Sequence, residues 1–84
     1  MTQTIIDVRT QQEYAVGHVE GSVNIPLNEI QQRLTEIKTM PQPILLCCAS
    51  GNRSGQATIF LKSSGVLCEN GGSWIDVHYK TIAA

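Results

Sequence analysis

The sequence predicts an α/β domain with a small, mostly parallel sheet of about four to five strands flanked by helices. Short apolar segments of strand length alternate along the chain with segments of helical periodicity, which is the pattern of β-α-β units. The segment 44–48 is apolar throughout, as is typical of a central strand buried on both faces of a parallel sheet. The chain has 84 residues and no internal repeat or linker, so we expect one domain over 1–84.

The first part of the chain predicts a strand, a short helix and a second strand. Residues 4–8 are mostly apolar and predict the first strand. Thr10 and Glu13 have the spacing of a capping box, in which each side chain bonds the backbone N–H of the other residue. Gly17 favours the end of that helix. Residues 22–25 predict the second strand.

The clearest helical periodicity in the chain follows. Residues 27–38 predict one helix, with Asn28 near its start as a capping residue. Pro41 and Pro43 come directly after it and prevent its continuation. The apolar positions that recur at helical spacing are Leu27, Ile30, Leu34 and Ile37.

The second half repeats the alternation. Residues 44–48 predict the third strand, 54–64 a helix and 66–68 a short fourth strand. Residues 70–73 read Asn-Gly-Gly-Ser, which predicts a turn. The segment 74–79 is expected to form a last helical turn or an irregular segment.

Charge and apolar content limit the classes of partner. The formal net charge is −1 and no Lys/Arg cluster is present, so no nucleic-acid partner is expected. Hydrophobic residues make up 42% of the chain, which is enough for a folded core. The longest apolar run is far shorter than a membrane span, and the first residues lack the basic-then-apolar pattern of a signal peptide. We therefore expect no membrane partner and a cytoplasmic location.

The three cysteines do not predict a disulfide or a metal site. They are Cys47, Cys48 and Cys68, an odd number in a chain without an export signal. Neighbouring side chains on a strand point to opposite faces, so Cys47 and Cys48 should not pair. His18 and His78 do not complete a metal-binding spacing, so neither a metal nor a cofactor is expected.

The loop after the third strand favours a reactive cysteine. Cys48 lies at the carboxyl end of that strand, where ligands bind in parallel sheets. Gly51 and Asn52 tolerate a positive φ, so the loop can turn backbone N–H groups inward as an anion-binding nest. The N-terminus of the next helix and the charge of Arg53 would also lower the pKa of a thiol there. We interpret Cys48 as a nucleophile and Cys47 and Cys68 as buried core residues.

The same loop resembles the active-site loop of the rhodanese family, the thiosulfate sulfurtransferases. The matching pattern is Cys48-x-x-Gly51-x-Arg53-Ser54. Two departures are Ser22, where alanine is usual, and Ala49, where many members carry a charged residue. The other matching segments, in order, are Asp7-Val8-Arg9, Glu13-Tyr14, Gly17-His18-Val19-x-Gly21-Ser22-x-Asn24-Ile25-Pro26 and Gly71-Gly72-x-Trp74. The match covers nearly the whole chain and is closest to the short, single-domain type.

The resemblance implies a rhodanese-like fold and a sulfur-transfer mechanism. The Cys48 thiolate would attack the outer sulfur of thiosulfate, release sulfite and keep a persulfide. A thiophilic acceptor such as cyanide, a thiol or a protein thiol would then take the sulfur. No cofactor is implied, and a monomer is expected. The substrate would be bound by the main-chain N–H groups of Ala49, Ser50, Gly51, Asn52 and Arg53.

Two alternatives stay open on the sequence. The domain could be a non-catalytic binding module or a thiol redox sensor with Cys48 as the sensing residue. It could also be a cysteine-dependent phosphatase, because Cys47 and Arg53 have the Cys-x5-Arg spacing of those enzymes. Two observations argue against the phosphatase. Gly51 is at the wrong position for that spacing, and Leu46 stands where those enzymes usually have histidine.

Four further residues of the matching segments have structural interpretations. Asp7 and Arg9 are expected to form a structural ion pair, since either charge alone would be costly to bury. His18 is expected to hold the turn between Gly17 and Ser22 by hydrogen bonds. Trp74, the only tryptophan, is expected to pack in the core.

Overall fold

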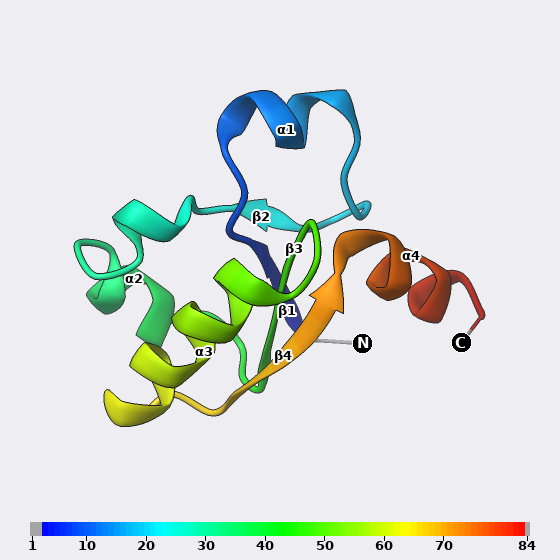
Figure 1. Ribbon diagram of the computed structural model, residues 1–84. Helices are drawn as coiled ribbons and strands as arrows, with labels where there is room; N and C mark the ends of the chain where they lie inside the picture. The colour runs from blue at the N-terminus through cyan, green and yellow to red at the C-terminus, as the bar shows by residue number, and fades with distance from the viewer. Residues whose placement is uncertain (1–2, 84) are drawn as a thin grey trace.

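One four-stranded parallel sheet forms the centre of the computed structural model, which describes residues 3–83 (Figure 1). The strand order is β2-β1-β3-β4, so β1 and β3 are central, and every neighbouring pair is parallel. The strands are β1 (Thr4–Asp7), β2 (Val23–Asn24), β3 (Ile44–Cys48) and β4 (Cys68–Ser73). The predicted α/β class and the central place of segment 44–48 are confirmed.

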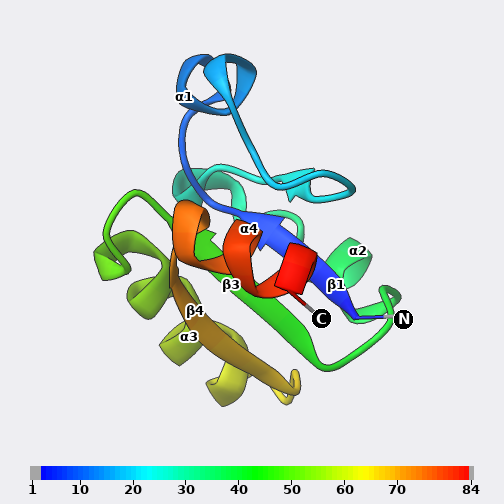
Figure 2. The same cartoon turned by 90° about the vertical axis from the view of Figure 1, so that its right-hand side faces the viewer.

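Helices cover both faces of the sheet. Figures 1 and 2 show α3 and α2 on one side, α4 on the other, and α1 beyond the carboxyl ends of the strands. The helices are α1 (Gln11–Val16), the 3₁₀ turn η1 (Leu27–Glu29), α2 (Leu34–Lys38), α3 (Asn52–Ser63) and α4 (Trp74–Ala83). Within residues 3–83, none of these helices has the length and apolar character needed to cross a membrane.

The two faces of the sheet carry separate apolar clusters. The larger cluster joins the sheet to η1, α2 and α3 and includes Leu46, Cys48 and Cys68. The smaller cluster is formed by Val19, Cys47 and Val77, with Trp74 packed against it. Cys47 and Cys48 therefore point to opposite faces of β3, as predicted from strand geometry. All three cysteines are free and buried.

The capping box at the start of α1 is confirmed. The backbone N–H of Glu13 donates to Thr10 Oγ1 at 3.2 Å, and the backbone N–H of Thr10 donates to Glu13 Oε1 at 3.0 Å. Gly17 follows the last residue of α1 as its C-cap. The short helix thus begins and ends where local signals predict.

The prediction of one helix over 27–38 is wrong. The segment forms η1, a turn and then α2, and Arg33 at the N-cap of α2 has a non-helical φ of −103° and ψ of 20°. Asn28 makes no capping bond. Ile30 and Ile37 are nevertheless buried. The apolar spacing indicates which side chains are buried in the core, but not whether the helix is continuous. A 3₁₀ turn followed by a short helix buries the same side chains as one long helix would.

The boundaries of the C-terminal elements also differ from the prediction. β4 occupies 68–73, so the predicted strand at 66–68 begins later and the predicted turn at 70–73 is part of the strand. α3 begins two residues earlier than predicted, and α4 continues to Ala83. The partners of Leu46 and Cys47 on β4 are Asn70 and Gly72, so Gly71 is an extra residue in a bulge. Pairing with β3 therefore overrides the local turn signal of the two glycines.

Candidate active site

Cys48 ends β3, and a three-residue loop joins it to α3. Gly51 has a φ of 101°, in the left-handed region, and a Cβ built there would lie 3.2 Å from the Cα of Gly72. A side chain at Gly51 would meet both backbone strain and this close contact. Among the described residues only glycines have positive φ, so of the two residues that tolerate it, Gly51 adopts a positive φ and Asn52 does not. It begins α3 instead.

Three hydrogen-bond donors converge on the sulfur of Cys48. The backbone N–H of Gly51 lies 3.0 Å from Sγ, and the backbone N–H of Ser54 lies 3.4 Å away. The third donor is the hydroxyl of Ser54, at 3.3 Å. The predicted nest is therefore present in part, with the first turn of α3 completing it. Ser54 is the residue whose role was not predicted, although it closes the matching sequence pattern.

These bonds decide the ionisation of Cys48. Cys48 is only 1% exposed, and this burial by itself raises the pKa of its thiol. Hydrogen bonds from the Ser54 hydroxyl and from the backbone N–H groups of Ser54, Ser50 and Gly51 outweigh burial and lower the pKa to about 7. About half of the molecules thus carry a thiolate, the nucleophilic form, near neutral pH.

The other two cysteines have the opposite character. Burial, followed by the negative charge of Asp7, raises the pKa of Cys47 to about 12. Burial also raises the pKa of Cys68, and its sulfur contacts the carbonyl oxygen of Thr58 at 3.7 Å. Both residues are therefore neutral at physiological pH, in agreement with the prediction that they belong to the core.

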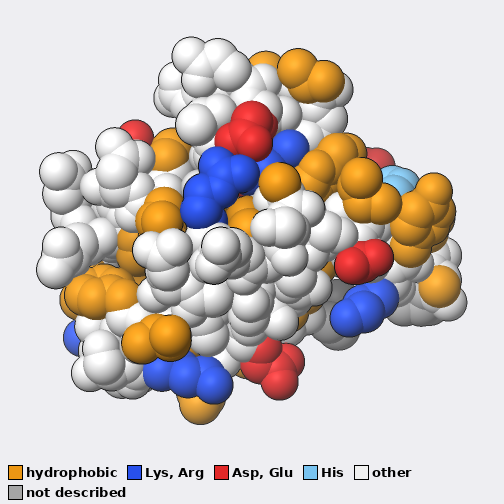
Figure 3. Space-filling model, in the orientation of Figure 1, with side chains coloured by type: hydrophobic (Ala, Val, Ile, Leu, Met, Phe, Trp, Pro, Cys, Tyr) orange, Lys and Arg blue, Asp and Glu red, His pale blue; other side chains and the backbone are white. Residues whose placement is uncertain are grey.

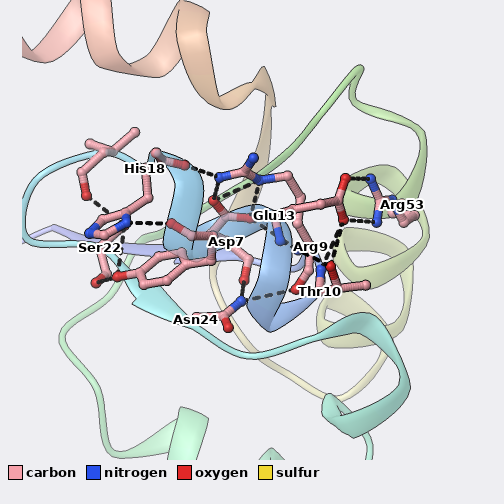
Figure 4. A network of polar contacts seen from close by, with 11 residues as sticks. Asp7, Arg9, Thr10, Glu13, His18, Ser22, Asn24 and Arg53 are labelled. Carbon is pink, nitrogen blue, oxygen red and sulfur yellow. Dashed lines mark hydrogen bonds and ion pairs between the residues drawn. The ribbon is translucent and has the colours of Figure 1, made fainter.

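Arg53 is paired with Glu13 of α1. Its Nη1 and Nη2 lie 2.8 and 3.1 Å from the two carboxylate oxygens (Figure 4). The hydrogen bonds from Arg53, and then from the backbone of Thr10, lower the pKa of Glu13 to about 2. The guanidinium thus joins the start of α3 to α1 through an ion pair. It makes no bond to the loop carbonyls and is not a free charge facing a substrate. In the view of Figure 3, acidic and basic side chains meet below α1.

The Asp7–Arg9 pair has the structural role expected for it. Arg9 Nη2 lies 2.8 Å from Asp7 Oδ2, both side chains are buried, and the same nitrogen donates to the carbonyl of Gly17 at 2.7 Å (Figure 4). The guanidinium carbon of Arg9 also lies 4.8 Å from the centre of the Trp74 ring. This network joins the end of β1 to the end of α1 and to the start of α4.

His18 holds the segment after α1 in place. Its ring stacks on Tyr14 with centroids 3.7 Å apart, and its Nδ1 lies 2.7 Å from the carbonyl oxygen of Tyr14. The Tyr14 hydroxyl donates to the carbonyl of Ser22 at 2.6 Å. His18 has a structural role, as expected, but its hydrogen bond runs to α1, and it is Tyr14 that bonds the far end of the turn at Ser22.

A pocket lies next to Arg53, between the residues that follow β1 and those that follow β2. Its volume is about 290 Å³. It is lined by Val8, Thr10, Pro26, Leu27, Asn28 and Arg53. Among residues 3–83, no group of three or more His, Cys, Asp or Glu side chains is arranged to hold a metal ion.

Comparison with known proteins identifies the family. The family model of the rhodanese-like domain matches residues 1–79. The chain belongs to the rhodanese-like family. Within this family it is 36% identical to the thiosulfate sulfurtransferase PspE of Escherichia coli K12, over 86% of this chain and 71% of that protein. A solved structure described as a rhodanese with anions from E. coli has a TM-score of 0.80 at 34% identity, covering 88% of this chain and 89% of that one.

A second relative differs more in length. The rhodanese-like chain is 43% identical to the uncharacterized protein YqhL of Bacillus subtilis, over 73% of its own length and 48% of that protein. It therefore spans about half the length of YqhL. Family membership supports sulfurtransferase activity in general.

The geometry of this rhodanese-like domain argues against the phosphatase alternative. That alternative needs Cys47 as the nucleophile, because only Cys47 has the required spacing to Arg53. Cys47 lies in the smaller core cluster on the opposite face of the sheet from Cys48, and its pKa is raised to about 12. The loop donors bond Cys48 instead.

Proposed function

We propose that this protein is a sulfurtransferase that carries a sulfane sulfur as a persulfide on Cys48. The observation that carries the proposal is the convergence of three donors on the Sγ atom of a single buried cysteine. Such donors stabilise a thiolate at neutral pH. Burial raises the pKa of the other two thiols and keeps them protonated. Membership of the rhodanese-like family supports the same chemistry.

The first half-reaction loads the cysteine. The Cys48 thiolate attacks the outer sulfur of thiosulfate and a new Sγ–S bond forms. The S–S bond of thiosulfate breaks, and sulfite leaves with the electron pair of that bond. The negative charge on the outer sulfur of the persulfide would be stabilised by the main-chain N–H groups of residues 49–53, which act as an oxyanion hole does.

The second half-reaction unloads it. A nucleophilic acceptor such as cyanide or a thiolate attacks the outer sulfur, the Sγ–S bond breaks, and its electron pair returns to Cys48 as the thiolate. No redox cofactor or metal is needed for either step. Because each half-reaction uses one substrate, the proposal includes ping-pong kinetics.

Features of the site indicate a small donor. Cys48 is 1% exposed, so the approach to Sγ favours a small donor over a bulky one. The acceptor attacks the outer sulfur of the persulfide and does not have to reach Sγ. Thiosulfate is the donor named for PspE, and a small thiol or a protein thiol is the proposed acceptor. Ala49 places no charge next to Cys48, and Arg53 is neutralised by Glu13. Long-range attraction of an anionic donor should therefore be weak, with a high KM for thiosulfate.

Intact mass spectrometry tests the proposal directly. The purified protein and its Cys48→Ser and Cys47→Ala variants are incubated with thiosulfate and then with cyanide. We expect the original protein and Cys47→Ala to gain one sulfur atom that cyanide removes, and Cys48→Ser to gain none. Cys47→Ala is the matched control, because it removes the neighbouring thiol from the other face of β3.

Other outcomes would contradict the proposal. Sulfur uptake by Cys48→Ser would move the persulfide to another residue. No uptake by any variant would exclude thiosulfate as the donor. A glutathione or oxygen adduct on Cys48, formed with an oxidant in the absence of sulfur uptake, would favour the redox sensor instead.

A further inference from the structure

Asn70 on β4 competes with Cys48 for the hydroxyl proton of Ser54. Ser54 Oγ lies 2.6 Å from Asn70 Oδ1 and 3.3 Å from Cys48 Sγ. A serine hydroxyl has a single proton, so it donates to only one of the two acceptors at a time. The hydroxyl therefore has two possible orientations within the same site.

The orientation of the Asn70 amide is fixed by its other bonds. Its Nδ2 donates to the carbonyl of Gly51 at 2.9 Å, and its Oδ1 accepts the backbone N–H of Gly72 at 3.0 Å. The oxygen, and not the nitrogen, therefore faces Ser54. When the Ser54 hydroxyl turns away, the N–H of Gly72 still satisfies Oδ1, so neither orientation leaves a polar atom without a partner.

We propose that Asn70 is a positioning residue that holds the Ser54 hydroxyl while the Cys48 sulfur is uncharged and releases it to Sγ when the thiolate forms. The proton stays on Ser54 Oγ throughout, and only the O–H bond rotates. No covalent bond forms or breaks in this step.

The competition for the Ser54 proton stands on the hydrogen bonds alone, and only its role during sulfur transfer rests on the proposed function. In the thiolate, Sγ carries the negative charge and needs donors. In the persulfide the charge moves to the outer sulfur, and Sγ becomes a poor acceptor. A hydroxyl with a second acceptor satisfies both states, whereas a hydroxyl committed to Sγ would favour the empty enzyme over the loaded one.

The surrounding groups allow this role to be isolated. The charged group that interacts with Cys48 is Arg53 of α3, which is paired with Glu13 of α1. The buried Asp7–Arg9 pair at the end of β1 acts on Cys47, and Asp7 also acts on Arg53. Substitution of Asn70 by an uncharged residue leaves all four unchanged.

The loop also keeps an anchor without the Asn70 side chain. The carbonyl of Gly51 accepts the N–H of Gly55 at 3.0 Å as well as Asn70 Nδ2. Removing Asn70 therefore leaves one bond to the Gly51 carbonyl.

The test is a titration of the Cys48 thiolate by its ultraviolet absorbance, which needs neither a sulfur donor nor access of a reagent. The variants are Asn70→Ala, Ser54→Ala and the double variant. Ser54→Ala should raise the pKa of Cys48. Asn70→Ala should lower it by about half to one pH unit, giving about three- to tenfold more thiolate below the pKa. The double variant should titrate as Ser54→Ala does.

Two further variants complete the test. Glu69→Ala is the matched control, because it shortens an exposed side chain one position earlier on β4 and should leave the pKa of Cys48 unchanged. Asn70→Asp keeps the shape of the side chain and offers a stronger acceptor. It should raise the pKa of Cys48, and more so with Ser54 present than with alanine at that position.

Defined results would overturn the inference. A higher pKa in Asn70→Ala, or an equal effect of Asn70→Ala with and without Ser54, would show that Asn70 does not compete for this proton. The titration involves no sulfur transfer. It can support the role of Asn70 even if no variant takes up sulfur, and the mass experiment can support sulfur transfer even if Asn70 has no effect on the pKa. The two proposals are therefore tested separately.

Discussion

At the scale of single residues, hydrogen bonds rather than charges set the reactivity of Cys48. The donors of Gly51 and Ser54 lower the pKa of this thiol to about 7, against the opposing effect of burial. We therefore predict that the rate of sulfur uptake from thiosulfate rises with pH and reaches half of its plateau near pH 7, because the thiolate is the attacking form. Single-turnover mass spectrometry across pH measures this profile. A midpoint near the ordinary thiol value would contradict it.

At the scale of elements, the contact between α1 and α3 depends on Glu13 and Arg53. Glu13→Gln keeps an amide oxygen for the N-cap of α1 but removes the carboxylate that neutralises Arg53. We predict a lower KM for thiosulfate in this variant, since the guanidinium is then free to attract an anion. Steady-state kinetics measures the KM. Glu20→Gln is the matched control, because it neutralises an exposed glutamate outside the site. An equal or higher KM in Glu13→Gln alone would contradict the prediction.

The bulge in β4 requires a glycine at position 71, because α4 and β3 pack closely against it. A Cβ at Gly71 would lie 2.8 Å from Val77 Cγ2 of α4 and 3.0 Å from Leu45 Cγ of β3. We predict that Gly71→Ala lowers the free energy of unfolding by about 1–3 kcal/mol, because the packing of α4 on the sheet must shift to admit a methyl group. Denaturant unfolding measures the change, and an unchanged midpoint would show that this contact relaxes at no cost.

The elements differ in how far they could be predicted from sequence. The capping box of α1 and the apolar run of β3 are local signals, and both were correctly predicted. The break after η1 was not, because residues on the same face are buried whether or not the helix is continuous. β4 crosses the Gly71–Gly72 pair because β3 supplies its hydrogen bonds. Ser54 and Asn70 are 16 positions apart in sequence, so their contact depends on the packing of α3 against β4.

At the scale of the whole molecule, the sheet has short or irregular edges. β2 contributes only two residues at one edge, and β4 at the other is interrupted by its bulge. Such edges offer few regularly spaced groups for pairing with another chain. We predict a monomer, measured by light scattering coupled to size exclusion. A mass that rises with protein concentration would contradict this and would direct attention to α4, over which hydrophobic side chains gather (Figure 3).

Because Cys47 and Cys48 point to opposite faces of the sheet, the acidity of the chain's thiols depends on whether β3 is correctly folded. A slip of β3 by one residue would exchange the two sulfurs between the faces of the sheet. The native register presents one acidic thiol, whereas an unfolded or shifted chain presents thiols of ordinary acidity. The thiolate absorbance at mildly acidic pH would therefore measure the native fraction of a sample, without any substrate, thiol reagent or fluorescent label.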